Sequence, residues 1–251
     1  MKSELPGATG RLISFEMLWD EVEDRRVYPF SIPALAALSS MDLDRPVTFL
    51  VGENGSGKST LIEALAVAAG LNPEGGSQNL KFSTRSSHSP LHEHLRLAWR
   101  GRPHKAFFLR AESFYNVASA YDKLREETHL QIPDYHLFSH GESFLEVVQG
   151  HFRGPGLYLM DEPESALSVL GQLQLLIHTH QSVARGGQFV IASHSPILTA
   201  FPEAVIYRLN EKGIKEVGYT DTEPYQMTKS FLESPPAFLH HLFAAGDEPG
   251  T

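Results

Sequence analysis

The sequence predicts an α/β fold, a mainly parallel sheet with helices on both faces. Short, continuous apolar runs recur along the chain at Val47–Val51, Leu157–Met160 and Phe189–Ala192, and such runs are typical of strands buried on both faces. Segments with helical spacing of apolar residues alternate with these runs, which favours parallel strands joined by helices. We also expect an N-terminal antiparallel β portion and a small helical lobe.

The N-terminal elements follow from local composition. Arg11–Trp19 and Val27–Ile32 are rich in β-branched, aromatic and apolar residues and are predicted strands that precede Val47–Val51. Ser59–Gly70 has apolar residues on one helical face and a glycine where a C-cap would stand, so it is a predicted helix. A glycine-rich loop joins the strand Val47–Val51 to this helix, so the three elements form a strand–loop–helix unit.

The remaining elements are predicted from the same patterns. In chain order they are a short helix at Leu91–Trp99, a strand at Ala106–Ala111, a helix through Tyr121–Glu127, helices at Gly141–Phe152 and Ala166–Ala184, a short helix at Ile197–Phe201, and a hairpin of Val205–Leu209 and Ile214–Val217. We expect residues 1–251 to form one domain, in which residues 72–150 form the lobe or helical insertion.

Composition narrows the class of protein. The chain has 251 residues, no cysteine and a formal net charge of -9, which excludes disulfides, thiolate nucleophiles and cysteine-based zinc sites. The acidic balance argues against a protein that wraps nucleic acid along its whole surface. The N-terminus lacks the apolar core of a signal peptide, and no stretch approaches the roughly 20 apolar residues of a membrane span. We therefore expect a cytoplasmic protein without membrane contact.

The glycine-rich loop fits the pattern G-x-x-x-x-G-K-[ST] in full, between a buried strand and a helix. Its residues are Gly52, Glu53, Asn54, Gly55, Ser56, Gly57, Lys58, Ser59 and Thr60. Glycines let backbone N–H groups converge on phosphate oxygens, and the helix N-terminus adds positive partial charge. Lys58 would reach the β- and γ-phosphates of ATP, and the Ser59 hydroxyl would ligate Mg²⁺. The alternative is a turn that merely joins the strand to the helix.

Polar residues follow two other buried strands. Asp161 and Glu162 come directly after Leu157–Met160, and His194 follows Phe189–Ala192. In a doubly wound sheet ligands bind at this edge, so Asp161 suits the magnesium shell, Glu162 suits polarising an attacking water, and His194 suits contact with a γ-phosphate. The alternatives are an acidic turn and a structural histidine.

A third element, Ser139-His140-Gly141-Glu142, begins a predicted helix about 20 residues before Asp161. Taken alone, Ser139 is better explained as a helix N-cap.

In identity, order and spacing, these elements resemble the ABC ATPase family, over about Val47–Ser195. The loop matches its Walker A motif, Asp161-Glu162 its Walker B aspartate and catalytic glutamate, and His194 its switch histidine. Ser139–Glu142 stands where the family has its L-S-G-G-Q signature, although His140 and Glu142 depart from that motif.

The whole chain is similar to small stand-alone bacterial ATPases that are labelled AAA-family or AAA-like, and that are closer to the SMC/RecF branch than to transporter subunits. The shared segments are YPF at Tyr28–Phe30, FSTRSSHSPL at Phe82–Leu91, FFLRAESF at Phe107–Phe114, SHGESF, LMDEPESALS and SHSPIL.

The resemblance implies Mg²⁺-dependent ATP hydrolysis, with Glu162 and His194 as catalytic residues and Ser59 and Asp161 as metal ligands. It also implies a head-to-tail homodimer with two ATP molecules at its interface, in which Ser139 and Gly141 complete each site from the other chain. Two alternatives stay open: a slow-turnover ATP-dependent binding module for a nuclease or DNA partner, and a transporter's nucleotide-binding subunit.

Several positions stay ambiguous. The adenine-stacking aromatic of the family would be Tyr28 or Phe30, and its Q-loop glutamine would be replaced by Arg110 or Glu112, unless Gln78 takes that place. The histidines His88, His92 and His94 are either ordinary loop residues or a zinc site. The basic residues of Lys81–Lys105 form either a solvated surface or a contact for nucleic acid.

Overall fold

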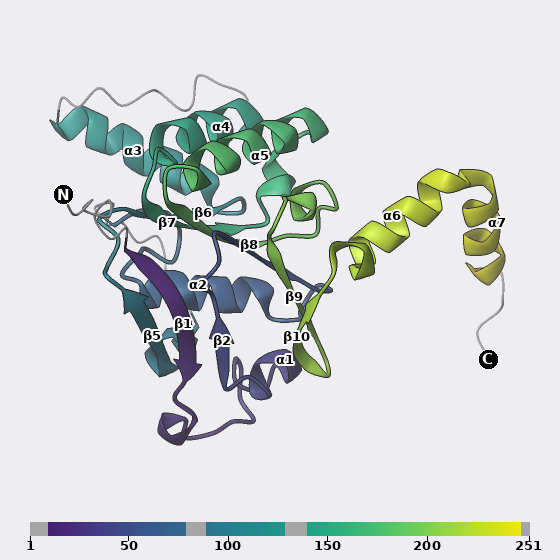
Figure 1. Cartoon of the computed structure of the whole chain (residues 1–251), viewed down its shortest axis with the longest axis horizontal. Coiled ribbons are helices and arrows are strands. Elements are labelled where there is room, and N and C mark those ends of the chain that lie inside the picture. Colours follow the sequence, from purple (N-terminus) through teal and green to yellow (C-terminus); the bar gives the residue numbers. More distant parts are fainter. Residues whose placement is uncertain (1–9, 79–88, 129–139, 247–251) are drawn as a thin grey trace, which may run out of the picture.

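A seven-stranded sheet runs through the centre of the molecule in the order β10-β9-β3-β8-β7-β6-β4 (Figure 1). The five inner strands are parallel, and the two edge strands are antiparallel to their neighbours. The strands are β3 (Val47–Val51), β4 (Gly76–Ser77), β6 (Ala106–Arg110), β7 (Gly156–Asp161), β8 (Gly187–Ala192), β9 (Val205–Asn210) and β10 (Gly213–Val217). This computed structural model describes residues 10–78, 89–128 and 140–246.

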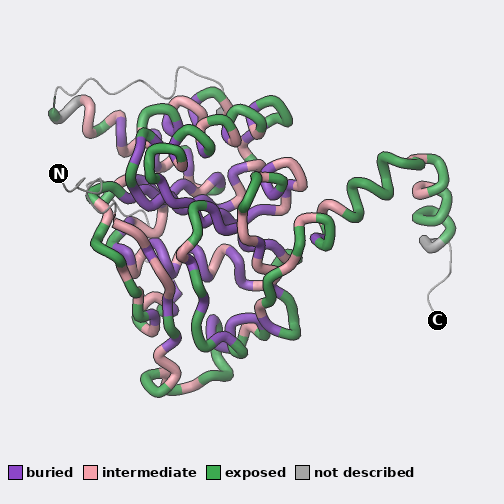
Figure 2. Tube along the Cα trace, viewed as in Figure 1, coloured by how far each residue is buried: buried purple, intermediate pink, exposed green. Residues whose placement is uncertain are grey.

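Helices cover both faces of this sheet. Helix α2 (Lys58–Ala68) lies on one face, and α3 (Phe114–Thr128), α4 (His140–His151) and α5 (Val169–Val183) lie on the other (Figure 1). Alternate residues of each inner strand supply the two cores. In β7, Leu157 and Leu159 join the cluster around α2, whereas Tyr158 and Met160 join the cluster under α3, α4 and α5. The buried central strands in Figure 2 reflect this two-sided packing.

A second, antiparallel sheet of three strands covers α2 from outside, in the order β2-β1-β5. Its strands are β1 (Arg11–Met17), β2 (Ser40–Asp42) and β5 (Leu95–Arg100). Leu12 and Phe15 of β1 are fully buried and pack in the same core as Leu61 and Leu65 of α2. The predicted N-terminal antiparallel β portion and the predicted mainly parallel sheet with flanking helices are both confirmed.

One buried side chain ties the two sheets together. Gln188 of β8 is 2% exposed, and its Oε1 accepts a hydrogen bond from the Leu12 amide at 2.8 Å. Its Nε2 donates to the carbonyl oxygens of Leu12 (2.7 Å) and Leu43 (2.6 Å). The register of β1 against β5 shifts between Leu12 and Ser14, next to this contact. Gln188 thus satisfies three buried backbone groups at once.

Two predicted elements were wrong. Val27–Ile32 forms turns, not a strand, with Ser31 N donating to Val27 O and Ile32 N to Pro29 O. Pro29 has no N–H to offer a strand ladder, and Pro33 instead opens the short helix α1 (Pro33–Ala36). Leu91–Trp99 is not a helix: a 3-10 turn at Pro90–His94 leads into strand β5.

The pattern of inward and exposed residues explains why Leu91–Trp99 was wrongly predicted as a helix. Leu95, Leu97 and Trp99 face inward while Arg96 and Ala98 are exposed, which is the period of a strand. The segments Ser40–Asp42 and Gly76–Ser77 are short strands that pair with β1 and β6.

The chain continues beyond the predicted hairpin into two helices, α6 (Glu223–Glu233) and α7 (Pro235–Gly246), that project from the body (Figure 1). Short 3-10 turns complete the described elements, at Trp19–Glu21, Pro163–Ala166, Leu198–Ala200 and Tyr219–Asp221. The predicted short helix Ile197–Phe201 corresponds to the third of these. Over the described ranges, none of the helices has the length and apolar content that a bilayer crossing requires.

Replacing Gln188 with alanine should lower the free energy of unfolding by about 2–4 kcal/mol, because three buried backbone groups lose their partner. Urea denaturation followed by circular dichroism measures this. Gln181→Ala, at an exposed position of α5, is the matched control and should change stability by less than about 0.5 kcal/mol. Equal stability of the two variants would contradict the role of Gln188.

Candidate functional site

The candidate site lies where three neighbouring parallel strands end. Leu50 of β3 pairs with Ala192 of β8, and Ala192 pairs with Asp161 of β7, so the segments that follow these strands leave the sheet at one edge. The glycine-rich loop follows β3, Glu162 follows β7, and His194 lies two residues after β8. The fold therefore brings together the three groups of residues that the sequence placed after buried strands.

The loop is shaped as a phosphate cradle would need to be. Gly57 has φ of 97° and is the N-cap of α2, a conformation that favours glycine. A Cβ on Gly52 would lie 2.3 Å from the Leu209 carbonyl oxygen, so the close approach of β9 also requires glycine. The loop borders a cavity of about 700 Å³ together with residues 208–212 and Glu223. The N-terminus of α2 follows this loop directly, and its positive partial charge favours an anion there.

Lys58 lies folded over the loop. It is 3% exposed, and its Nζ donates hydrogen bonds to the carbonyl oxygens of Gly52 at 2.8 Å and Glu53 at 2.9 Å. Burial lowers the pKa of the Lys58 ammonium, and the negative charges of Glu162 and Asp161 oppose this shift. A buried cation held only by neutral carbonyls has the charge and position to accept a phosphate as its partner.

Ser59 and Asp161 meet directly, although 102 positions separate them in the sequence. The Ser59 hydroxyl donates to Asp161 Oδ1 at 2.9 Å. Burial raises the pKa of Asp161 to about 6, while nearby Arg110 and the Ser59 hydrogen bond act in the opposite direction. A hydroxyl and a buried carboxylate are oxygen ligands of the kind that Mg²⁺ prefers, so this pair fits the metal that the sequence predicts.

Glu162 stands on a strained backbone. Its φ and ψ are 48° and 50°, a left-handed conformation that is uncommon outside glycine, and its amide donates to Ala192 O at 2.9 Å. Its Oε1 lies 3.5 Å from His194 Nε2. That His194 nitrogen is buried and makes no hydrogen bond within the described residues, while the His194 amide donates to the Glu164 carboxylate. The two side chains are thus close and available to a ligand between them.

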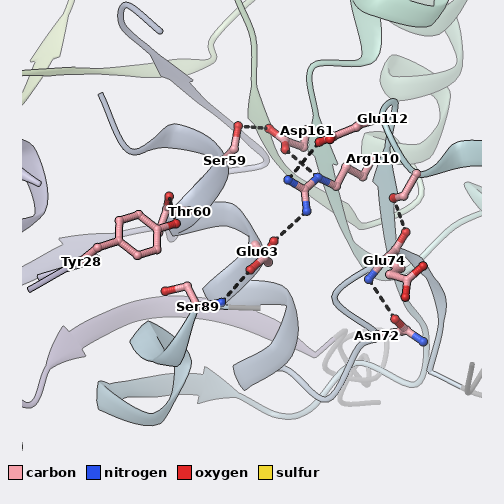
Figure 3. Close-up of polar contacts among 11 residues, drawn as sticks. Tyr28, Ser59, Thr60, Glu63, Asn72, Glu74, Ser89, Arg110, Glu112 and Asp161 are labelled. Carbon is pink, nitrogen blue, oxygen red and sulfur yellow. Dashed lines mark hydrogen bonds and ion pairs between the residues drawn. The ribbon is translucent and has the colours of Figure 1, made fainter. Parts of the chain in front are cut away.

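Arg110 and Glu63 join this site. Figure 3 shows the Arg110 guanidinium between three carboxylates, with Nη1 2.7 Å from Glu63 Oε2, Nη2 3.3 Å from Glu112 Oε2 and Nε 3.4 Å from Asp161 Oδ2. The sequence marked Arg110 only as a departure from a family pattern and gave no role to Glu63. An acidic residue on the otherwise apolar helix Ser59–Gly70 was the available signal.

The structure decides between some ambiguous positions. Phe30 is 5% exposed and packs edge-on against Trp19 and His94, so it is a core aromatic. Tyr28 is 63% exposed, and its hydroxyl lies 3.3 Å from Thr60 Oγ1, next to the loop (Figure 3).

Gln78 follows Ser77, which pairs with Phe107 on an antiparallel strand. The chain there runs toward the amino end of β6, away from the edge that carries the site. Arg110, by contrast, lies at the carboxyl end of β6 and lines the same cavity as Ser59 and Asp161.

The signature-like segment is only partly described. Ser139 lies outside the described residues, and Gly141 lies in the first turn of α4. A Cβ on Gly141 would lie 3.1 Å from the Ala166 carbonyl oxygen, so this glycine lets α4 approach the segment after Glu162 closely. Within one chain, Gly141 therefore has a packing reason to be glycine.

The structure gives little support to a zinc site at the histidines or to a nucleic-acid contact at the basic residues. Among the described residues, no group of three or more metal-binding side chains is arranged to hold an ion, and His88 lies outside that part of the chain. His92 Nδ1 is 3.0 Å from the Ser89 carbonyl oxygen. Of the basic residues, Arg96 pairs with Glu16 and Arg100 with Asp44, as on a solvated surface, while Lys81 and Arg85 are not described.

Replacing Asp161 with asparagine should stabilise the metal-free protein at pH 7.5. Because the pKa of Asp161 is raised in the folded state from 3.8 to about 6, its charged form costs stability above about pH 6, and this cost disappears as pH falls toward 4. The gain should be on the order of 2 kcal/mol at pH 7.5 and should shrink at pH 5. Urea denaturation in EDTA measures it, with exposed Asp20→Asn as control. A destabilised Asp161→Asn protein at pH 7.5 would contradict the assigned environment.

Comparison with known proteins gives three kinds of match. The AAA domain family profile matches residues 35–105, which include the loop. The chain is 29% identical over 182 residues to the hemin import ATP-binding protein HmuV of Rhodopseudomonas palustris, covering 62% of this chain and 68% of that protein. It is 31% identical over 173 residues to the zinc import ATP-binding protein ZnuC of Vibrio parahaemolyticus, covering 65% of this chain and 60% of that one.

Among solved structures, the SMC head domain from Thermotoga maritima aligns with a TM-score of 0.42 and 14% identity, covering 71% of this chain and 92% of that one. The sequence matches agree with the motifs, their order and their place at one sheet edge. The chain is thus similar to ATP-binding proteins of the ABC type over about two thirds of its length.

Proposed function

We propose that this chain binds ATP together with Mg²⁺ at the glycine-rich loop and hydrolyses it to ADP and phosphate. The observation that carries the proposal is the contact between Ser59 and Asp161, which unites the loop with the acidic strand end and has Glu162 beside it. The AAA profile and the two ATP-binding relatives support the nucleotide.

Each residue then has a defined task. The amides of Gly52–Ser59 and the Lys58 ammonium bind the phosphates. Ser59 and Asp161 hold Mg²⁺, which supplies positive charge to the reacting phosphoryl group. Glu162 orients the attacking water and takes its proton, and His194, 3.5 Å away, holds Glu162 and the terminal phosphate in place. The exposed ring of Tyr28 stacks on the adenine.

We further propose that two copies close head to tail around two ATP molecules, as in the ABC family. A single chain carries one loop and one signature-like segment, and Ser139 and Gly141 would act on the nucleotide of the other copy. Hydrolysis removes the bridging phosphate and loosens the pair, which makes the dimer a switch.

Glu162→Gln should lower the rate of ATP hydrolysis by about 10²–10⁴-fold while ATP still binds, because only the general base is lost. Lys58→Ala should abolish ATP binding itself, since the phosphates lose their buried cation. Phosphate release and equilibrium dialysis with labelled ATP separate the two effects. Undiminished turnover in the Glu162→Gln protein would exclude Glu162 as the base.

The Glu162→Gln protein should become dimeric in ATP and Mg²⁺ and return to a monomer when the nucleotide is removed. Light scattering coupled to size exclusion measures the mass. Lys58→Ala, which keeps the fold but lacks the phosphate contact, is the control and should stay monomeric. A strictly monomeric Glu162→Gln protein in ATP would contradict the head-to-tail pair.

A second candidate function is that of a transporter's nucleotide-binding subunit, which is favoured by the similarity to two import ATP-binding proteins. A subunit of that kind would co-purify with a membrane protein. A slow-turnover binding module would instead show ATP turnover that changes on addition of DNA or of a nuclease partner. Pull-down of the Glu162→Gln protein with ATP, followed by identification of the bound protein, distinguishes the transporter subunit from the binding module.

A further inference from the structure

Arg110 places a permanent positive charge on the metal side of the site. It is the last residue of β6 and pairs in register with Asp161 of β7. Together with Ser59, Asp161 and Glu162 it lines a cavity of about 290 Å³. The guanidinium places a cation in the cavity whether or not Mg²⁺ is bound.

The position of this charge is set by Glu63. The Arg110 Nη1 hydrogen bond to Glu63 Oε2 is 2.7 Å long, and the two side chains are 23% and 13% exposed. Glu63 is in turn fixed by the Ser89 amide, which donates to its Oε1 at 3.2 Å (Figure 3). A charge-assisted hydrogen bond between two mostly buried side chains is well suited to hold a guanidinium in one orientation.

The contact with Asp161 is of a different kind. Arg110 Nε lies 3.4 Å from Asp161 Oδ2, and this buried nitrogen makes no hydrogen bond within the described residues. Asp161 instead accepts a hydrogen bond from the Ser59 hydroxyl, through its other carboxylate oxygen, Oδ1. Arg110 therefore acts on Asp161 through its charge, and its anchor at Glu63 leaves it in place when Asp161 changes partner.

We propose that Arg110, held by Glu63, is a fixed counter-charge that makes nucleotide binding less dependent on Mg²⁺. This inference rests on the proposed ATP site. A guanidinium beside the metal ligand repels a divalent cation and attracts a polyphosphate, so it supplies part of the positive charge that Mg²⁺ supplies elsewhere. Arg110 is in this sense a positioning residue that sets the metal requirement of binding.

The test compares the dissociation constant of a fluorescent ATP analogue in EDTA and in excess Mg²⁺. For Arg110→Gln, binding in EDTA should weaken about tenfold while binding in Mg²⁺ changes less than about threefold, so the EDTA-to-Mg²⁺ ratio of dissociation constants rises. Arg110→Lys should keep a ratio near that of the wild type because it keeps the charge. Arg153→Gln, at an exposed arginine before the amino end of β7, is the matched control and should leave both constants unchanged.

Glu63→Asp supplies an independent arm, because it keeps the negative charge but shortens the side chain, which breaks the 2.7 Å hydrogen bond that anchors Arg110. This variant should raise the EDTA-to-Mg²⁺ ratio of dissociation constants by a few-fold. It still tests the proposal if the Arg110→Gln protein does not fold. An unchanged ratio, or equal weakening in EDTA and Mg²⁺, would overturn the proposal for Arg110. If the wild-type protein binds the analogue in neither condition while remaining folded, the proposed ATP site itself fails, and the role of Arg110 fails with it.

Discussion

The parallel register of β3, β8 and β7 is the constraint on which the site depends. These strands are buried on both faces, so their order is set by the two hydrophobic cores and not by the polar residues that follow them. Because parallel strands end at one edge, the loop after β3, Glu162 after β7 and His194 after β8 are brought together. A core built by apolar burial thus supplies the precision that the chemistry needs.

The accumulation of charge at this edge is the second constraint. Asp161, Glu162, Glu63 and Glu112 surround the same small region, with Lys58 and Arg110 as the cations among the residues described there. A buried carboxylate with a raised pKa and a buried lysine held by carbonyls are both costly in a protein without ligand. A polyphosphate with its metal would satisfy both groups, which gives the site a physical reason to bind one.

Much of this arrangement was predictable from the sequence, for reasons that differ between elements. The central strands and the loop were predicted because continuous apolar runs and the glycine pattern are local signals. Leu91–Trp99 was misassigned because a period-two pattern with leucines and one alanine also tolerates a helix. Val27–Ile32 looked like a strand by composition, and Pro29 decided against it.

Within the site, the sequence predicted the residues that directly follow strands, such as Asp161 and Glu162. It did not predict Glu63, which reaches the site only through a side-chain contact. Glu63 lies on α2, which follows β3, and it meets Arg110 at the end of β6 only in the assembled sheet, in which β8 and β7 lie between these two strands. Gln188 is a similar case, since its three partners lie on segments 145 and 176 positions away. Such long-range polar contacts depend on the finished topology.

The most direct test of the central claim is a crystal structure of the Glu162→Gln protein with ATP and Mg²⁺. The account predicts the phosphates against the amides of Gly52–Ser59, with Mg²⁺ about 2.0–2.1 Å from the Ser59 hydroxyl oxygen and Asp161 bound to it directly or through a water. The residue at position 162 should face the water beside the terminal phosphate. Nucleotide bound elsewhere, or a metal that contacts neither Ser59 nor Asp161, would contradict it.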